Sequence, residues 1–217
     1  MGIHRRHDNP SFAMAGPTID FWNERFRTRT TGWDRGAVNP QLVAWMAHGQ
    51  LQPCRILVPG CGSGHEVLHL AAAGFEVTAL DYAVEAVDLV KSRLDAAGLC
   101  AQVVQTDVRH WHAPAPFDAV WEQTCLCALY PDDWQTYARR LHGWLKPDGQ
   151  LFALFMQSPK PGAEDGWIQG PPYHCDIQAM RAILPAGEWN WPKPPYPRVS
   201  HPAGMAELAL ILSPRAG

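Results

Sequence analysis

The sequence lacks several features that define whole classes of protein. No apolar run approaches the roughly 18 residues of a membrane-spanning helix, and the N-terminus has no apolar core of a secretory signal. The 18 basic and 21 acidic residues include no run of Lys or Arg, so nothing indicates a nucleic-acid track. We therefore expect a cytoplasmic protein that binds neither membranes nor nucleic acid.

The six cysteines form no recognisable pattern. They stand at positions 54, 61, 100, 125, 127 and 175, without the paired C-x-x-C units of a zinc site or a disulfide framework. These positions favour buried, reduced thiols, and we expect no bound metal. A length of 217 residues suits a single domain, which we expect to be monomeric.

The most informative stretch of the sequence runs from Ile56 to Val67. Apolar β-formers end at Pro59, glycines follow at 60, 62 and 64, and apolar residues then recur at helical spacing. A strand, a glycine-rich turn and a helix in this order favour nucleotide binding. A dinucleotide fingerprint needs G-x-G-x-x-G, and its third glycine is missing here in both frames. The remaining G-x-G-x-G is typical of class I methyltransferases that use S-adenosylmethionine.

A carboxylate at the end of the next strand supports this interpretation. The run Glu76–Leu80 ends at Asp81, which is 81 − 60 = 21 residues after Gly60 and near the spacing of about 20 expected for a ribose-binding acid. An NAD(P)-dependent oxidoreductase would share these features, and it stays as an alternative that the glycine spacing opposes. A catalytically silent regulator that binds S-adenosylmethionine is a second alternative.

The rest of the chain predicts an α/β fold. Strands expected at 101–104, 117–121 and 151–156 alternate with amphipathic helices, which predicts a doubly wound, mostly parallel seven-stranded sheet with helices on both faces. Residues 188–191 and 205–212 are expected to form a closing antiparallel hairpin. Residues 1–17 should be a flexible arm, and 18–217 one domain in which 18–50 form a helical lid. The Pro- and Gly-rich segment 159–172 is expected to cover the substrate.

Candidate site residues follow from these positions. Asp107 and the Val108 backbone come after the third strand and are predicted to bind adenine, with a solvated turn as the alternative. The end of the fourth strand should face the crevice where open α/β sheets bind ligands, and we expect the methyl acceptor there. Trp22 and Trp33 are either lid residues near a sulfonium, where a cation on an aromatic face gains about 0.5–2 kcal/mol, or core anchors.

Several segments together resemble the thiopurine methyltransferase family, including its bacterial members and the plant thiol and halide methyltransferases. They are Phe21–Phe26, Trp33–Asp34, Val58–Glu66, Leu80–Asp81, Phe117–Asp118, Cys127–Leu129, Leu145–Gly149 and Gly170–Tyr173. The resemblance implies methyl transfer from S-adenosylmethionine to sulfur, or to another soft nucleophile such as halide or selenium. The cofactor-binding residues that we predict are Trp22, Trp33, Gly60, Cys61, Gly62, Asp81, Tyr82, Asp107, Val108 and Thr124.

The chain departs from the family after the fourth strand. Members that methylate thiopurines tend to have Asp-Arg where this chain has Glu122 and Gln123, so a small thiol or halide is the expected acceptor. Glu122, Tyr173 and His174 are candidates for orienting the acceptor or removing a proton, whereas Glu122 as a cap and His174 as a surface residue are the alternatives. The G-P-P-Y segment also resembles the [DN]-P-P-Y motif of amine methyltransferases, but it follows the fifth strand rather than the fourth.

Overall fold

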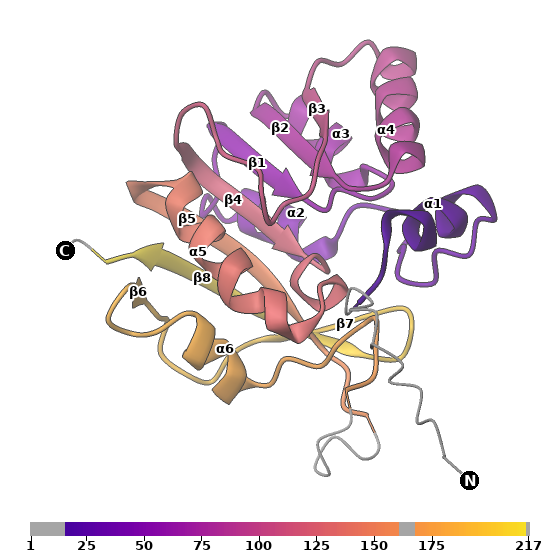
Figure 1. The fold of residues 1–217 in the computed structure, drawn as a ribbon. Coiled ribbons are helices and arrows are strands. Elements are labelled where there is room, and N and C mark those ends of the chain that lie inside the picture. Colours follow the sequence, from indigo (N-terminus) through magenta and orange to yellow (C-terminus); the bar gives the residue numbers. More distant parts are fainter. Residues whose placement is uncertain (1–15, 161–167, 216–217) are drawn as a thin grey trace, which may run out of the picture.

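A twisted sheet forms the centre of the computed structural model, which describes residues 16–160 and 168–215 (Figure 1). Within these residues the sheet has eight strands in the order β3-β2-β1-β4-β5-β8-β6, and β7 pairs with β8. The strands are β1 Arg55–Pro59, β2 Glu76–Asp81, β3 Gln102–Gln105, β4 Phe117–Gln123, β5 Leu145–Gln157, β6 Trp189–Asn190, β7 Arg198–Ser200 and β8 Ala206–Pro214. Strands β1 to β5 pair in parallel, and β8 runs antiparallel to β5.

The predicted fold class is therefore confirmed, with differences at the C-terminal end. The expected hairpin exists, but β6 has only two residues and pairs with the last residues of β8. An additional short strand, β7, pairs with the first part of β8. The expected arm falls almost wholly in residues 1–15, outside the described residues, as does part of the expected cover, residues 161–167.

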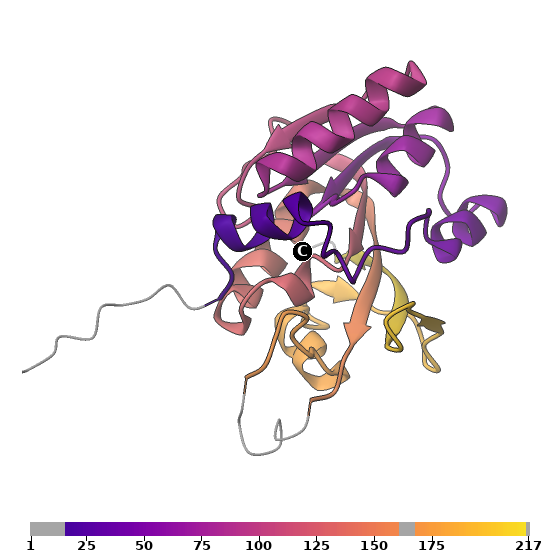
Figure 2. The same cartoon turned by 90° about the vertical axis from the view of Figure 1, so that its right-hand side faces the viewer.

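Helices cover both faces of the sheet (Figures 1 and 2). They are α1 Ile19–Arg27, α2 Pro40–Ala47, α3 His65–Ala72, α4 Val84–Ala97, α5 Trp134–Trp144 and α6 Ile177–Ile183, with 3₁₀ turns η1 Leu126–Ala128 and η2 Pro131–Asp133. Because successive strand residues point to opposite faces, Ile56 and Val58 pack in a core with α2, α3 and α4. Leu57 packs with α5 and α6 on the other face. None of the helices in the described part of the chain is both long and apolar enough to span a membrane.

Local signals set several helix boundaries as the sequence predicts. The Asn39 side chain accepts a hydrogen bond from the Gln41 N–H at 2.8 Å, and Pro40 opens α2. Gly98 ends α4 in the left-handed conformation. The sequence also predicts a cap of α5 by Asp132 or Asp133, but the Asp133 side chain makes no capping bond. It accepts a hydrogen bond from Arg109 at 2.6 Å instead, so a tertiary contact overrides the local preference.

The glycine turn between β1 and α3 needs its glycines for conformation and for space. Gly60, Gly62 and Gly64 all have positive φ, which disfavours other residues. A Cβ on Gly64 would lie 2.6 Å from Cγ2 of Val90, so this glycine lets α3 and α4 approach each other. The turn lies at the carboxyl edge of the sheet, where Gly62 faces Phe26 of α1.

Candidate active site

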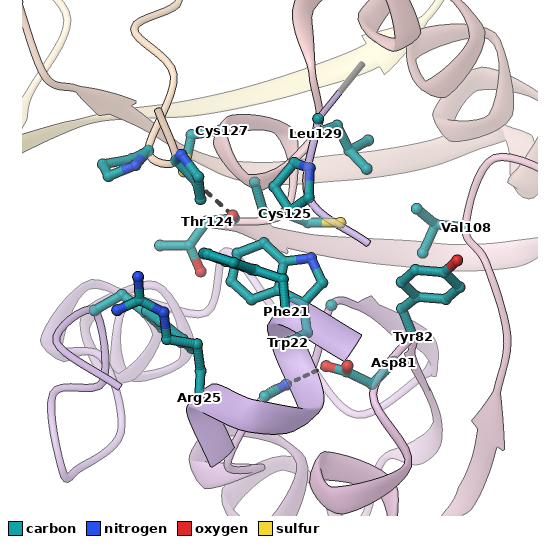
Figure 3. Close-up of a pocket in the computed structure, with 18 of the residues that line it drawn as sticks. Phe21, Trp22, Arg25, Asp81, Tyr82, Val108, Thr124, Cys125, Cys127 and Leu129 are labelled. Carbon is teal, nitrogen blue, oxygen red and sulfur yellow. Dashed lines mark hydrogen bonds between the residues drawn. The ribbon is translucent and has the colours of Figure 1, made fainter. Parts of the chain in front are cut away.

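A cavity of about 340 Å³ lies at the carboxyl ends of the parallel strands, under α1 (Figure 3). The sheet order divides its lining into two halves, defined by the strands that carry them. The β1–β3 half is lined by Gly60, Gly62, Asp81, Tyr82, Asp107 and Val108. The β4–β8 half is lined by Thr124, Cys125, Cys127, Met156, Ala203 and Met205.

Asp81 ends β2 and holds the glycine turn in place. Its carboxylate accepts hydrogen bonds from the N–H of Gly62 at 2.8 Å and the N–H of Ala83 at 2.9 Å. Burial raises the pKa of Asp81, outweighing the opposite effect of the backbone hydrogen bonds. Since a carboxylate offers about four acceptor sites, Asp81 keeps acceptor capacity toward the cavity.

Asp107 also lines the cavity, but a neighbouring arginine occupies its carboxylate. The Arg109 guanidinium donates to both oxygens at 2.6–3.0 Å, and it also reaches Asp133 at 2.6 Å. Burial is the largest influence on the Asp107 carboxyl, yet these hydrogen bonds together outweigh it and lower the pKa. Arg109 is thus neutralised by two carboxylates, and Asp133 is engaged here rather than as a helix cap.

Aromatic side chains of α1 and the following loop cover the cavity (Figure 3). Trp22 and Trp33 both line it and meet edge to face, with ring centroids 5.4 Å apart. Phe26 packs against Trp33 in the same way at 5.9 Å. The N–H of Val84 donates to the Asn23 side chain at 2.9 Å, which ties α1 to the start of α4. The two tryptophans are half-buried in the cover, outside both core clusters.

A buried polar network fixes the loop that carries Trp33. The Arg35 guanidinium donates to Glu207 at 2.6 Å, and Glu207 is fully buried at the start of β8. His201 lies 3.1 Å from the Trp33 carbonyl oxygen, which accepts from its ring nitrogen. The Asn39 N–H donates to Glu66 on α3 at 2.9 Å. The loop is therefore held from both halves of the cavity.

The end of β4 shapes the β4–β8 half. Thr124 has a φ of 60°, a conformation that costs a non-glycine residue on the order of 1–3 kcal/mol. The Cys127 thiol donates to the Thr124 carbonyl at 3.2 Å (Figure 3). Burial raises the pKa of both Cys125 and Cys127 well above the ordinary thiol value, so these thiols stay protonated at neutral pH. They are wall residues and poor nucleophiles.

None of the three predicted catalytic candidates is among the residues that line the cavity. Glu122 is 1% exposed and accepts the Leu126 N–H at 2.8 Å, so it caps η1. Tyr173 is buried, and its N–H donates to the Cys127 carbonyl at 2.8 Å. His174 accepts the Ser158 N–H at 3.2 Å. These residues support the wall, and their side chains do not reach the cavity in this structure.

Glu122 is nevertheless an unusual group. Burial raises its pKa to about 8, and the nearby Glu207 adds to this. One oxygen caps η1 and the other is buried without a hydrogen-bond partner among the described residues. Gln123 turns the other way and donates to Glu207 at 3.2 Å. The pair that departs from the thiopurine-methylating pattern therefore makes its hydrogen bonds within the protein, Glu122 with the Leu126 N–H and Gln123 with Glu207.

Nine of the ten predicted cofactor residues line the cavity, and the tenth, Cys61, lines a smaller cleft of about 60 Å³ beside the glycine turn. Sequence reasoning missed Arg25 and Arg109, both of which line the cavity, whereas Pro171 and Pro172, which also line it, belong to the segment expected to cover the substrate. Arg109 stands two residues after Asp107, and this spacing was the available signal. Arg25 lies inside the family-like segment Phe21–Phe26, but only the fold brings it over β4.

The fold defines the class of protein. A solved structure of the 1,6-didemethyltoxoflavin N1-methyltransferase of Burkholderia thailandensis, with bound S-adenosylhomocysteine, superposes with a TM-score of 0.73 and 23% identity. The match covers 91% of this chain and 87% of that one. The fold is therefore the Rossmann-like fold of class I methyltransferases.

Sequence comparison defines the family. The family described as thiopurine S-methyltransferase matches residues 17–193. The chain is 37% identical over 183 residues to a thiopurine S-methyltransferase of Pseudomonas entomophila, covering 75% of this chain and 80% of that protein. It is 28% identical over 165 residues to thiocyanate methyltransferase 1 of Arabidopsis thaliana, covering 75% and 70%. The chain belongs to the thiopurine S-methyltransferase family and is an S-adenosylmethionine-dependent methyltransferase.

Proposed function

We propose that this enzyme transfers the methyl group of S-adenosylmethionine to the sulfur of a small molecule, or to another soft nucleophile such as halide or selenium. The observation that carries the proposal is the single cavity in which the glycine turn and Asp81 adjoin a wall rich in sulfur. That wall contains the side chains of Cys125, Cys127, Met156 and Met205. Relatives named thiol, thiocyanate and thiopurine methyltransferases support an acceptor of this class.

The residues of the β1–β3 half fit the nucleoside part of the cofactor. Asp81 has acceptor capacity for ribose hydroxyls, and the backbone near Val108 offers polar groups to adenine. The Asp107 carboxylate is shared with Arg109, so we assign Asp107 mainly to shaping this end. The cleft beside Cys61 has a polar lining that includes Asp34, His65 and Thr124, and it suits the amino-acid end of the cofactor.

The chemistry places modest demands on the protein. When bound, the cofactor would supply an electrophilic methyl group on a positively charged sulfur, and a neutral thioether would be its leaving group. Positioning alone can contribute about 7–11 kcal/mol to such a reaction. Trp22 and Trp33 exclude water and present aromatic faces to a cation. No side chain of the cavity wall is needed as a base when the acceptor is already an anion.

We further propose that residues 18–50 act as a lid that opens for exchange of ligands. The contact between Asn23 and Val84 closes one side of the cover and lies at the surface, so it can break without disturbing the core. A cytoplasmic location and a monomeric state complete the proposal. Gel filtration with light scattering checks the latter.

The direct test supplies purified protein with S-adenosylmethionine carrying a ¹³C-labelled methyl group and one acceptor at a time. The panel comprises thiocyanate, iodide, an aliphatic thiol, an aromatic thiol, selenite and a thiopurine. We expect the label to appear in the methylated product of thiols, thiocyanate or iodide and not of the thiopurine. Binding of the cofactor without methylation of any acceptor would favour the silent regulator instead.

A further inference from the structure

Among the described residues, two arginines line the cavity, and their surroundings differ. Arg109 is paired with Asp107 and Asp133, each at 2.6 Å, so its charge is neutralised within the protein. The Arg25 side chain has no hydrogen bond or ion pair among residues 16–160 and 168–215. It is half-buried, and its guanidinium carbon lies 4.7 Å from the centre of the Phe21 ring. Arg25 is thus the cation of the described lining that carries no protein counter-charge.

The position of Arg25 separates the charges of the cavity. In the view of Figure 3, Arg25 lies on the same side of the aromatic cover as Thr124 and Cys127, while Asp81 and Tyr82 lie on the opposite side. The β1–β3 half carries carboxylates, and the β4–β8 half faces a positive charge. A negatively charged ligand is therefore repelled from one half and attracted to the other.

We propose that Arg25 is the specificity-determining residue that binds the negative charge of the methyl acceptor, so that the preferred acceptors are small anions such as thiocyanate, iodide or thiolates. This inference rests on the proposed function. The Arg25 guanidinium can donate hydrogen bonds to a bound anion. Its stacking on the Phe21 ring fixes its direction without using any of its N–H groups.

The chain offers a matched control on the same helix. Arg27 also lies in the last turn of α1, is 67% exposed and pairs with Glu24 at the surface. Removing its charge changes the net charge of α1 as much as removing that of Arg25. A general electrostatic effect of α1 must therefore change the kinetics of both the Arg25 and the Arg27 variant. Loss of acceptor recognition must change only those of the Arg25 variant.

The experiment compares wild type, Arg25→Gln, Arg25→Lys and Arg27→Gln. In steady-state kinetics with thiocyanate and with iodide, we expect Arg25→Gln to raise KM for both anions about 10- to 100-fold, the range for losing a hydrogen bond to a charged group. KM for S-adenosylmethionine should stay within about twofold. Arg25→Lys should recover part of the loss, because it keeps the charge without the fork, and Arg27→Gln should match wild type.

A binding measurement separates this inference from the proposed function. Thiocyanate is titrated calorimetrically into the S-adenosylhomocysteine complexes of wild type and Arg25→Gln, where no turnover is possible. Loss of thiocyanate affinity in the variant supports the inference, and equal affinity overturns it. If wild type binds thiocyanate through Arg25 but methylates no acceptor, the proposed function fails, and Arg25 is an anion-binding residue without a role toward a methyl acceptor.

A second test needs only wild type and covers the case of a variant that does not fold. Nitrate, an unreactive monovalent anion, should inhibit competitively against thiocyanate and not against S-adenosylmethionine. The inference would be overturned if nitrate competed only with S-adenosylmethionine. It would also be overturned if nitrate inhibited no more than sulfate does at the same salt concentration.

Discussion

The two halves of the cavity are built in different ways. The β1–β3 half comes from consecutive strands and their turns, chiefly from the backbone of Gly60 and Gly62 and from Asp81. The β4–β8 half combines the end of β4, the end of β5, the two prolines near 171 and the residues before β8, with Arg25 above them. Local sequence thus encodes the β1–β3 half, whereas distant segments of the chain come together in the β4–β8 half, where we propose that the acceptor binds.

The largest effect is expected from breaking the β1–β3 half at Asp81. Asp81→Ala removes the acceptor for ribose hydroxyls, each hydrogen bond to a charged group contributing about 1.5–3 kcal/mol. It also leaves the Gly62 N–H without its partner. Affinity for S-adenosylhomocysteine, measured by calorimetry, should fall at least about 100-fold. Asp88→Ala on the exposed face of α4 is the control, and an unchanged affinity for Asp81→Ala would contradict the assignment.

The free energy of unfolding is expected to depend on pH through Glu122, which lies in the β4–β8 half. Its folded pKa of about 8 lies above the ordinary value of 4.5, so the native state holds the proton more tightly than the unfolded chain. The resulting stability is fully present below about pH 4.5 and is lost as pH rises through about 8. Glu122→Gln keeps an acceptor for the Leu126 N–H and cannot ionise.

Urea unfolding at about pH 5 and pH 8 measures this effect. Relative to wild type, Glu122→Gln should gain about 3–4 kcal/mol over this interval, at about 1.4 kcal/mol per pH unit with partial titration at both ends. The exposed Glu188→Gln serves as the control and should track wild type. A difference between Glu122→Gln and wild type that does not change with pH would show that Glu122 ionises normally.

A smaller effect separates packing from backbone strain in the glycine turn. Gly64→Ala and Gly98→Ala both place a side chain at positive φ, but only at position 64 does the new Cβ meet another atom, Cγ2 of Val90 at 2.6 Å. Gly64→Ala should therefore lose about 1–3 kcal/mol more free energy of unfolding than Gly98→Ala. Equal losses in chemical denaturation would mean that α3 and α4 can move apart without cost.

The smallest effect concerns the cover shared by both halves. Trp22→Leu keeps an apolar side chain but removes the aromatic face. Because only S-adenosylmethionine carries the positive sulfur, its affinity should fall more than that of S-adenosylhomocysteine, by about 0.5–2 kcal/mol. Calorimetric titration of both ligands gives the difference, and Trp191→Leu, outside the cavity lining, should show none. Equal weakening of both ligands would assign Trp22 to packing alone.

The parts of the fold that sequence could predict are those with local causes. The glycine turn, the end of β2 at Asp81 and the cap at Asn39 depend on residues close in the chain. The position of Glu122 was predictable only in part. Alternation along β4 puts it on the same face as Val120, which α5 covers, so a buried cap fits better than a side chain in the crevice.

Other features depend on contacts that no local pattern carries. Asp133 looks like a helix cap, but Arg109 captures it from 24 residues away. Tyr173 and His174 directly follow the two prolines that line the cavity. Which residues of this segment face the cavity depends on the path of the loop, and the sequence does not reveal that path. The pair of Arg109 with Asp107 is local, but the second pair of Arg109, with Asp133, and the lack of an ion pair at Arg25 among the described residues emerge only from the folded structure.

The most direct test of the account is anomalous diffraction from crystals of the S-adenosylhomocysteine complex soaked in iodide. The account predicts that the nucleoside occupies the β1–β3 half with its ribose at Asp81, and that an iodide peak lies in the β4–β8 half in contact with the Arg25 guanidinium. Iodide absent from the cavity, or a nucleoside bound away from Asp81, would contradict it.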